Sequence, residues 1–127
     1  MKVLENLLYT KEHEWLRVEG EKAYLGITDF AQKALGSIVY VELPETDSEF
    51  KQGDTFGAIE SVKAASDVFI PLDGKIIEVN ESIVDDPALV NEDAFENWMI
   101  SFEILDNSQL STLMTASQYE EFCSKEE

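Results

Sequence analysis

The sequence predicts a mainly β domain with a few short helices, including one at the C-terminus. Most segments before residue 105 alternate apolar and polar residues in the period of a strand, or are rich in β-branched and aromatic residues. The segment after residue 109 instead spaces its apolar residues as a helix does. A chain of 127 residues can bury one hydrophobic core, so we expect a single domain over residues 1–127.

A weak internal repeat supports two similar halves. Gly36–Glu42 matches Gly74–Asn80 in a Gly-x-Ile-(Val/Ile)-x-Val pattern, at an offset of 38 residues, which is 74 minus 36. At the same offset Gly53-Asp54 falls on Asn91-Glu92, and each pair is expected in a turn. The repeat therefore predicts two strand–turn–strand halves, fewer than the three units that a solenoid needs.

The first expected strands are separated by short turns such as Glu19-Gly20-Glu21. These strands, of a mostly antiparallel sheet, are Trp15–Val18, Ala23–Ile27 and Ile38–Leu43. Between the second and the third, a short helix is expected within residues 28–36. Thr28 or Asp29 can cap its start, and Gly36 can stop it.

Further strands follow, with an acidic loop around Asp85 to Glu96 before the last of them. They are expected at Thr55–Val62, Val68–Pro71, Lys75–Val79 and Trp98–Leu105. Thr115 and Gln118 form a plausible capping box for the last helix. The apolar residues with helical spacing around this cap are Leu110, Leu113, Met114, Tyr119 and Phe122.

The charge of the chain limits its partners. The formal net charge is -18, from 27 acidic and 9 basic residues, and nucleic acid is therefore not expected as a partner. After Lys63 the basic residues are Lys75 and Lys125, while 15 of the acidic residues lie there. Either a macromolecular partner presents a basic surface, or the acidic surface keeps the protein soluble and monomeric.

The single cysteine, Cys123, allows no intrachain disulfide and no metal site built from several cysteines, which fits a reducing compartment. It is expected to be a residue of the C-terminal helix. Residues 1–10 contain too short an apolar run for a membrane span, lack a small-residue cleavage site and are not Arg-rich. We therefore expect a soluble, cytoplasmic protein with no membrane partner.

Lys63 lies between two expected strands and midway between the two halves of the repeat. It is followed by the small residues Ala64, Ala65 and Ser66, and residues 52–74 contain no other basic residue. A lysine at such a hairpin tip projects its amine into solvent. An enzyme that has to enclose this amine could reach it.

The segment Glu60–Val68 resembles the lipoyl-attachment motif of glycine cleavage H proteins. Other segments are similar to landmarks of that family in the same order, over residues 7–124: Tyr9–Trp15, Gly26–Gln32, Leu35-Gly36, Val39–Glu45, Glu78–Glu81, Leu89–Asn91 and Trp98. The resemblance implies a barrel-sandwich hybrid, a flattened β structure with the modified lysine at a hairpin and helices at its margin. The whole chain is then one lipoyl-carrier domain.

The resemblance also implies a function. Lipoic acid would be joined to Lys63 through an amide, by a lipoate ligase or an octanoyl or lipoyl transferase. The arm would take the aminomethyl group of glycine from glycine decarboxylase (P-protein) to aminomethyltransferase (T-protein), and dihydrolipoyl dehydrogenase (L-protein) would reoxidise it. The protein would be a non-catalytic carrier, and a monomer is expected because one arm has to serve several partners.

Two acidic residues match family positions that are associated with the docked arm. Glu14 and Asp67 could hold the ammonium of the loaded arm in a surface cleft that excludes water. Without the family, Glu14 could equally be a solvated strand carboxylate, and Asp67 a turn residue that caps the hairpin.

Alternatives remain open at this point. An H-like protein could serve mainly as a lipoyl or octanoyl relay in lipoic acid assembly, with the same lysine. Biotin is the second cofactor to consider, but the lysine of biotin carriers usually lies between two methionines, where this chain has Val62 and Ala64. No nucleophile–base pair, phosphate loop or metal cluster indicates an enzyme.

His13, the only histidine, is expected to pack beside Trp15 and not to bind a metal.

Overall fold

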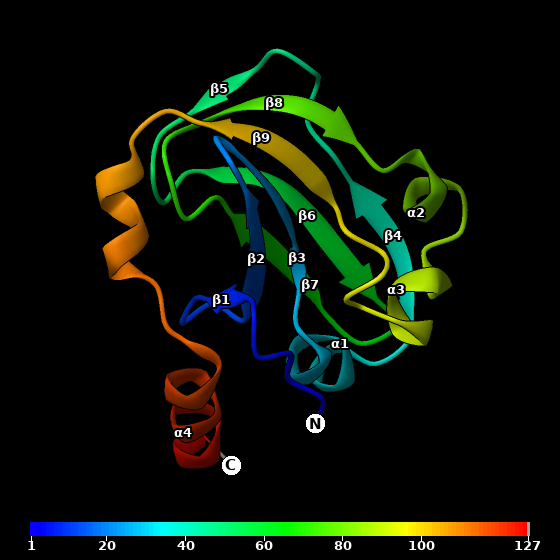
Figure 1. Ribbon diagram of the computed structural model, residues 1–127. Helices are drawn as coiled ribbons and strands as arrows, with labels where there is room; N and C mark the ends of the chain where they lie inside the picture. The colour runs from blue at the N-terminus through cyan, green and yellow to red at the C-terminus, as the bar shows by residue number, and fades with distance from the viewer. Residues whose placement is uncertain (127) are drawn as a thin grey trace.

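The computed structural model describes residues 1–126, and within them nine strands form two antiparallel sheets (Figure 1). The large sheet has the order β1-β2-β3-β9-β8-β5, and the small sheet has the order β4-β6-β7. The strands are β1 Leu8–Tyr9, β2 Glu14–Glu19, β3 Lys22–Ile27, β4 Ile38–Glu42, β5 Glu49–Phe50, β6 Thr55–Ser61, β7 Ala65–Phe69, β8 Gly74–Val79 and β9 Ile100–Ile104. The prediction of a mainly β, antiparallel structure is confirmed.

Helices lie at the margin of the two sheets (Figure 1). They are α1 Asp29–Leu35, α2 Glu81–Asp85, α3 Ala88–Glu92, the 3₁₀ helix η1 Asn107–Thr112, and α4 Ala116–Glu126. The predicted caps of α1 are confirmed, because the Thr28 hydroxyl accepts a hydrogen bond from the Ala31 N–H at 3.2 Å. Gly36 ends this helix with φ 83° and ψ -152°, a conformation that a side chain disfavours.

The main hydrophobic core lies between the two sheets. Its buried residues come from both: Leu25, Ile76 and Phe102 from the large sheet, and Val41, Ile59 and Val68 from the small sheet. Apolar side chains that alternate along each strand therefore point inward toward one shared core. This arrangement agrees with the expected barrel-sandwich hybrid.

The repeat is confirmed for its strands. β4 and β8 are the matching segments, and each is bulged at the same repeat position, between Ile38 and Tyr40 in β4 and between Ile76 and Glu78 in β8. The expected turn at Asn91-Glu92 is wrong, because both residues belong to α3. Tertiary contacts explain the difference, since the Asn91 side chain accepts from the Ile38 N–H and donates to the Gly36 carbonyl, both at 2.9 Å.

Two other differences from the predictions are larger than the one or two residues by which the ends of β4, β6 and β9 differ. The segment around Asp85 to Glu96 is not simply a loop, because it contains the end of α2 and all of α3. Each of these two short helices buries one apolar residue, Ile83 or Val90, in the main core. β7 begins at Ala65 and ends at Phe69, earlier than the predicted Val68–Pro71, because a tight turn brings the chain straight back onto β6.

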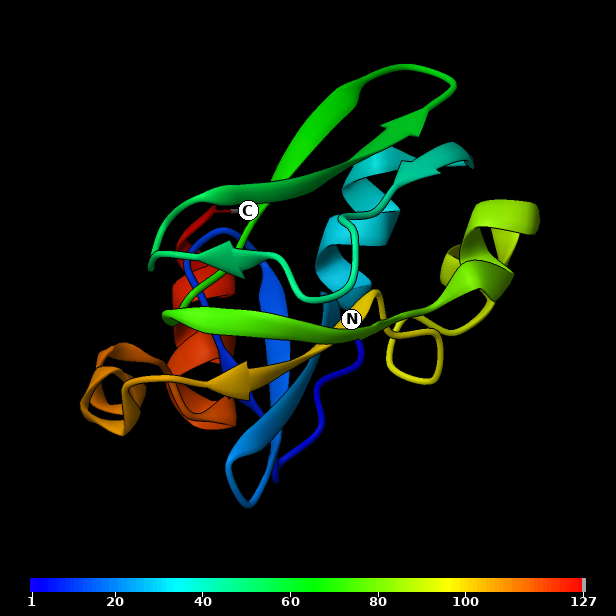
Figure 2. The same ribbon diagram turned by 90° about the horizontal axis from the view of Figure 1, so that it is seen from above.

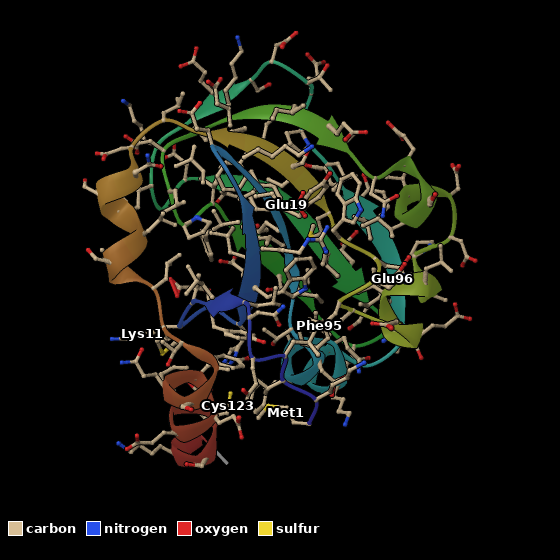
Figure 3. The ribbon with its side chains drawn as sticks, viewed as in Figure 1. Met1, Lys11, Glu19, Phe95, Glu96 and Cys123 are labelled. Carbon is tan, nitrogen blue, oxygen red and sulfur yellow. The ribbon has the colours of Figure 1, made fainter. Side chains whose placement is uncertain are left out.

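The C-terminal helix packs on a second cluster of buried residues. The predicted capping box is confirmed, since Thr115 N–H donates to Gln118 Oε1 at 2.9 Å and Gln118 N–H donates to Thr115 Oγ1 at 3.3 Å. The helical spacing is interrupted before this cap, where η1 ends. Cys123 lies on α4 on the side that faces the N-terminal segment (Figure 3). The cluster contains Leu7, Tyr9, Trp15, Phe95, Ala116, Tyr119 and Cys123.

Tyr119→Phe is expected to lower the free energy of unfolding by about 2 kcal/mol, because it removes two side-chain hydrogen bonds, one of them to the buried Thr28 hydroxyl. The Tyr119 hydroxyl is hydrogen-bonded to His13 Nδ1 at 2.8 Å and to Thr28 Oγ1 at 2.7 Å. The ring stack on Tyr9, with 4.6 Å between centroids, would remain. Urea unfolding measures the loss, and Tyr40→Phe, at an exposed tyrosine, is the control. Equal free energies of unfolding for Tyr119→Phe and Tyr40→Phe would contradict this account.

Candidate functional site

The hairpin between β6 and β7 carries Lys63 at its tip. Ser61 closes the turn, because its backbone N–H donates to the Ala64 carbonyl at 2.7 Å. The Ser61 hydroxyl also accepts hydrogen bonds from the N–H groups of Lys63 at 3.3 Å and Ala64 at 3.1 Å. Figure 2 shows this hairpin, in green, projecting beside α1 and β4, in cyan. The turn therefore holds the backbone of Lys63 in place at the edge of the molecule.

The Lys63 side chain is exposed and lies over Gly36, at the end of α1. A Cβ atom placed on Gly36 would be 3.5 Å from Lys63 Cε, so the glycine keeps the surface under the lysine flat. The Val62 N–H donates to the Ser37 carbonyl at 3.0 Å and fixes the hairpin against this segment. No ion pair involves Lys63 within residues 1–126. Its amine is accessible from solvent.

A small cleft of about 30 Å³ runs between β7, α1 and the chain that leads into β2. Its lining residues are Glu12, Glu14, Ile27, Ala31, Leu35, Ile59, Ser66, Asp67 and Val68. The structure thus brings Glu14 and Asp67 to one cleft, and Leu35, the neighbour of Gly36, also lines it. It has apolar walls and three carboxylates. Sequence reasoning did not single out Glu12, although it lies within a segment that carried the family resemblance.

Glu14 is a buried residue, only 2% exposed. Its Oε2 accepts from the Phe69 N–H at 2.8 Å, and its Oε1 accepts from the Thr10 hydroxyl at 3.1 Å. Burial raises the pKa of Glu14 from 4.5 to about 7, although these hydrogen bonds favour the charged form. The alternative of a solvated strand carboxylate is therefore wrong for Glu14. Asp67, in contrast, is exposed.

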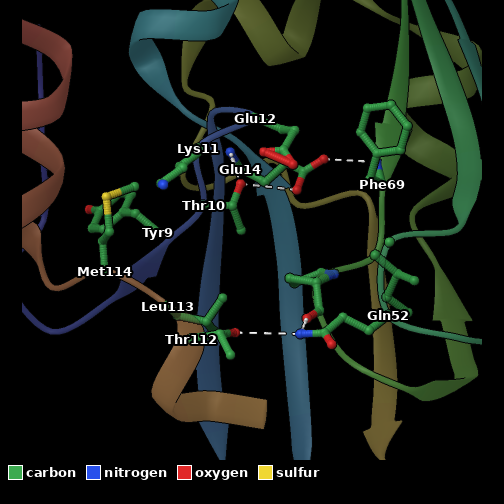
Figure 4. A pocket seen from close by; sticks show the side chains of 13 residues that line it. Tyr9, Thr10, Lys11, Glu12, Glu14, Gln52, Phe69, Thr112, Leu113 and Met114 are labelled. Atoms are coloured by element: carbon green, nitrogen blue, oxygen red, sulfur yellow. Dashed lines mark hydrogen bonds between the residues drawn. The ribbon is translucent and has the colours of Figure 1, made fainter. Parts of the chain in front are cut away.

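A larger cavity of about 300 Å³ lies on the other side of Glu14 (Figure 4). It is lined by Tyr9, Thr10, Lys11, Glu12, Glu14, Gln52, Gly53, Phe69, Ile70, Pro71, Thr112, Leu113 and Met114. The Gln52 amide nitrogen spans one end of it, donating to the Pro71 carbonyl at 3.1 Å and to the Thr112 hydroxyl at 3.4 Å. This cavity lies at the end of β7 that is farther from Lys63, while the cleft lies along the nearer part of the strand.

His13 holds the C-terminal helix and does not pack beside Trp15 as predicted. Its ring stacks on Phe30 with 4.4 Å between centroids, and its Nε2 lies 3.1 Å from Glu126 Oε2. The prediction is wrong because His13 has φ 67°, which turns the chain just before β2. Trp15 instead donates its indole N–H to the Ala94 carbonyl at 3.1 Å.

Neither a metal cluster nor a membrane-spanning helix occurs in the part of the chain that the structure describes. Residues 1–126 contain no group of three or more His, Cys, Asp or Glu side chains placed to hold a metal ion. Over the same range, no helix is both long enough and apolar enough to cross a membrane.

Comparisons with known proteins agree on one family. A sequence model of the glycine cleavage H-protein matches residues 7–126. The chain is 59% identical over 126 residues to the glycine cleavage system H protein of Thermoanaerobacter sp. (strain X514), covering 99% of this chain and 100% of that protein. It is 57% identical over 126 residues to the H protein of Alkaliphilus oremlandii (strain OhILAs), covering 99% of each. The crystal structure of a glycine cleavage system H protein from Mycobacterium marinum superposes with a TM-score of 0.84, at 33% identity and 98% coverage of both chains.

Proposed function

Because this chain belongs to the glycine cleavage H-protein family, the lipoyl carriers of the glycine cleavage system, we propose that it bears a lipoyl group on Lys63. With this group it shuttles the aminomethyl group of glycine between the enzymes of the system. The observation that carries the proposal is the position of Lys63, an exposed amine at a hairpin tip beside a cleft that Glu14 and Asp67 line. The protein is a carrier and leaves catalysis to its partners.

The partners of the proposed shuttle are the other components of the system. Glycine decarboxylase supplies the group, aminomethyltransferase removes it, and dihydrolipoyl dehydrogenase restores the carrier. A lipoate ligase or an octanoyl or lipoyl transferase prepares Lys63. The bound lipoyl group supplies a dithiolane that can be opened by reduction and closed by oxidation. The chain itself supplies position: a fixed hairpin, an accessible amine and a cleft beside it.

The residues present fit such an arm. The flat backbone at Gly36 leaves room for a long chain that leaves Lys63, and the cleft beyond it has apolar walls at Ala31 and Leu35. At about 30 Å³ this cleft does not enclose a whole arm, so an apolar arm would lie against its walls and bury part of its surface there. The carboxylates of Glu14 and Asp67 suit a cationic group at the end of the arm, and ionised Glu14 has lone pairs beyond the two that its hydrogen bonds use. A cleft of this kind also limits the access of water to a reactive group.

The proposal is tested by mass spectrometry after co-expression with a lipoate ligase in the presence of lipoic acid. Intact mass and peptide mapping are expected to show a single lipoyl adduct on Lys63 of the wild type and none on Lys63→Arg. Lys51→Arg, at another exposed lysine close to β6, is the matched control and is expected to be modified fully. No adduct, or an adduct on another lysine, would overturn the proposal.

Activity gives the second measurement. Release of carbon dioxide from glycine by added glycine decarboxylase is expected to depend on the lipoylated wild type, and Lys63→Arg is expected not to support it. Lipoylation without any stimulation of this reaction would keep the cofactor but contradict the proposed shuttle.

A further inference from the structure

The bulge in β4 exposes two large side chains next to each other. A bulge places two residues of one strand opposite one residue of its partner, so consecutive side chains no longer alternate between the faces. In β4 the exposed fractions are 56% for Val39 and 48% for Tyr40, while Ile38 and Val41 on either side are buried. The outer face of the small sheet therefore carries two adjacent large side chains, Val39 and Tyr40, at positions where smaller or charged side chains are usual.

This feature continues to the hairpin tip. Tyr40 pairs with Glu60 of β6, and two residues further along lies Val62, which is 72% exposed and directly precedes Lys63. The hydrogen bond from Val62 N–H to the Ser37 carbonyl ties the tip to the start of β4. We call Val39, Tyr40 and Val62 the tip patch. Val62 adjoins Lys63 in the chain, and the pairing of β4 with β6 brings Val39 and Tyr40 to the same end of the small sheet. This grouping differs from the scattered apolar residues that any surface contains.

Carboxylates border the tip patch. Side chains of paired residues lie on the same face of a sheet, as do those two apart in one strand. Tyr40 pairs with Glu60, and Glu42 lies two residues from Tyr40 in β4. Glu42 and Glu60 are therefore on the outer face with Tyr40, and both are exposed. A partner that fits this surface has an apolar centre and a basic rim.

We propose that the tip patch is the docking surface for the acyl-transferring enzyme that modifies Lys63. The inference rests on the proposed lipoylation. An enzyme that forms the amide has to enclose the amine of an unmodified lysine, so it has to contact the residues around it. Enzymes that act later meet the end of a much longer arm and can approach from farther away. Contact with the tip patch therefore matters most for the enzyme that attaches the acyl group to Lys63.

The chemistry of amide formation also requires close contact between the enzyme and the residues around Lys63. The neutral Lys63 amine attacks the carbonyl carbon of an activated acyl donor, an acyl adenylate or a thioester. The amide bond forms as the bond from that carbon to the leaving phosphate oxygen or sulfur breaks, and the amine loses its proton to a base of the enzyme. Since Nζ has to reach the acyl carbon inside the enzyme, Val62 and Val39 are brought against the rim of that active site.

The repeat offers a matched control. Ile77 holds the position in β8 that Val39 holds in β4, at the bulge between Ile76 and Glu78, and it is 42% exposed. β8 belongs to the large sheet and has no modified lysine at its end. Val39→Arg and Ile77→Arg therefore make the same change at equivalent backbone positions. Arginine is chosen because it cannot be acylated in place of Lys63 and because it repels a basic rim.

The experiment measures the initial rate of lipoylation of the full chain by a lipoate ligase. For Val39→Arg, kcat/KM is expected to fall about tenfold or more, as for loss of a central interface residue, while Ile77→Arg stays within about twofold of the wild type. Thermal unfolding of both variants shows that the fold is equally retained. If the wild type is not lipoylated, the proposed function fails. If the wild type is lipoylated and the two variants behave alike, only the docking inference fails.

A second measurement separates the partners. Val39→Arg that has been fully lipoylated by prolonged incubation is expected to support glycine decarboxylase as the wild type does. A variant that is lipoylated at the normal rate but fails with glycine decarboxylase would overturn the inference and assign the tip patch to that enzyme.

Discussion

Glu14→Gln is expected to be more stable than the wild type above pH 7, and the difference is expected to vanish below about pH 4.5. Burial raises the pKa of Glu14 from 4.5 to about 7, so the folded protein binds this proton more tightly than the unfolded chain does. Between these two values the folded state holds more protons, and the free energy of unfolding of the wild type therefore falls as pH rises. The difference between the two pKa values of Glu14 corresponds to a loss of roughly 3 kcal/mol in the free energy of unfolding, because one pKa unit is worth about 1.4 kcal/mol.

Glutamine isolates this effect because it keeps the geometry. Its amide oxygen can accept from the Phe69 N–H and its NH₂ group can donate to the Thr10 hydroxyl, which preserves both contacts of the Glu14 side chain. The many other carboxylates also make stability depend on pH, so the quantity to measure is the difference between variant and wild type. Urea unfolding from pH 4 to pH 9 gives that difference.

Asp67→Asn is the control for this prediction, because Asp67 lines the same cleft but is exposed. This variant removes a carboxylate at the same cleft without altering a buried group, so a difference confined to Glu14→Gln is specific to burial. Parallel stability curves for Glu14→Gln and the wild type would contradict the burial argument. Higher stability of Glu14→Gln than of the wild type at high pH would mean that the fold keeps an ionisable group buried in the wall of the cleft at a cost in stability. Proteins commonly do so at functional sites.

Gly57→Ala is expected to destabilise the protein by about 3 kcal/mol, at the upper end of the cost of overpacking. Gly57 lies in β6 opposite the end of β4, and a Cβ atom there would overlap the backbone carbonyl oxygen of Glu42. A carbonyl held in a sheet cannot rotate away as the end of a side chain can. The two strands would have to separate, and the small sheet that holds the Lys63 hairpin would be distorted.

Gly20→Ala is the comparison for Gly57→Ala, because it changes glycine to alanine without a clash. Gly20 lies in the turn between β2 and β3 with φ 67°, and a Cβ atom added there would have no neighbouring atom within 4 Å. Only the left-handed backbone is penalised, at about 1 kcal/mol. Urea unfolding of both variants gives the comparison. Equal losses, or a larger loss for Gly20→Ala, would show that the approach of β6 to β4 is not tight.

Local signals in the sequence were enough for much of the fold. The period-2 segments identified β2, β3, β4, β6, β8 and β9, and the Thr28 and Gly36 signals identified α1, because these patterns depend on neighbouring residues alone. The two-residue strands β1 and β5 were not predicted, since they are too short to show a period and exist only through pairing. The same limit applies to α2 and α3, whose few residues are held by contacts with the core.

The sequence by itself determined where a lysine could stand free, because a strand, a small-residue turn and a second strand are contiguous around Lys63. It could not determine that Glu14 is buried, since the partner that orients this carboxylate, the Phe69 N–H, is 55 residues away. The cleft exists only after β7, α1 and the segment before β2 have come together. Burial and shared walls depend on packing between distant segments, and for that reason the tertiary structure decided them.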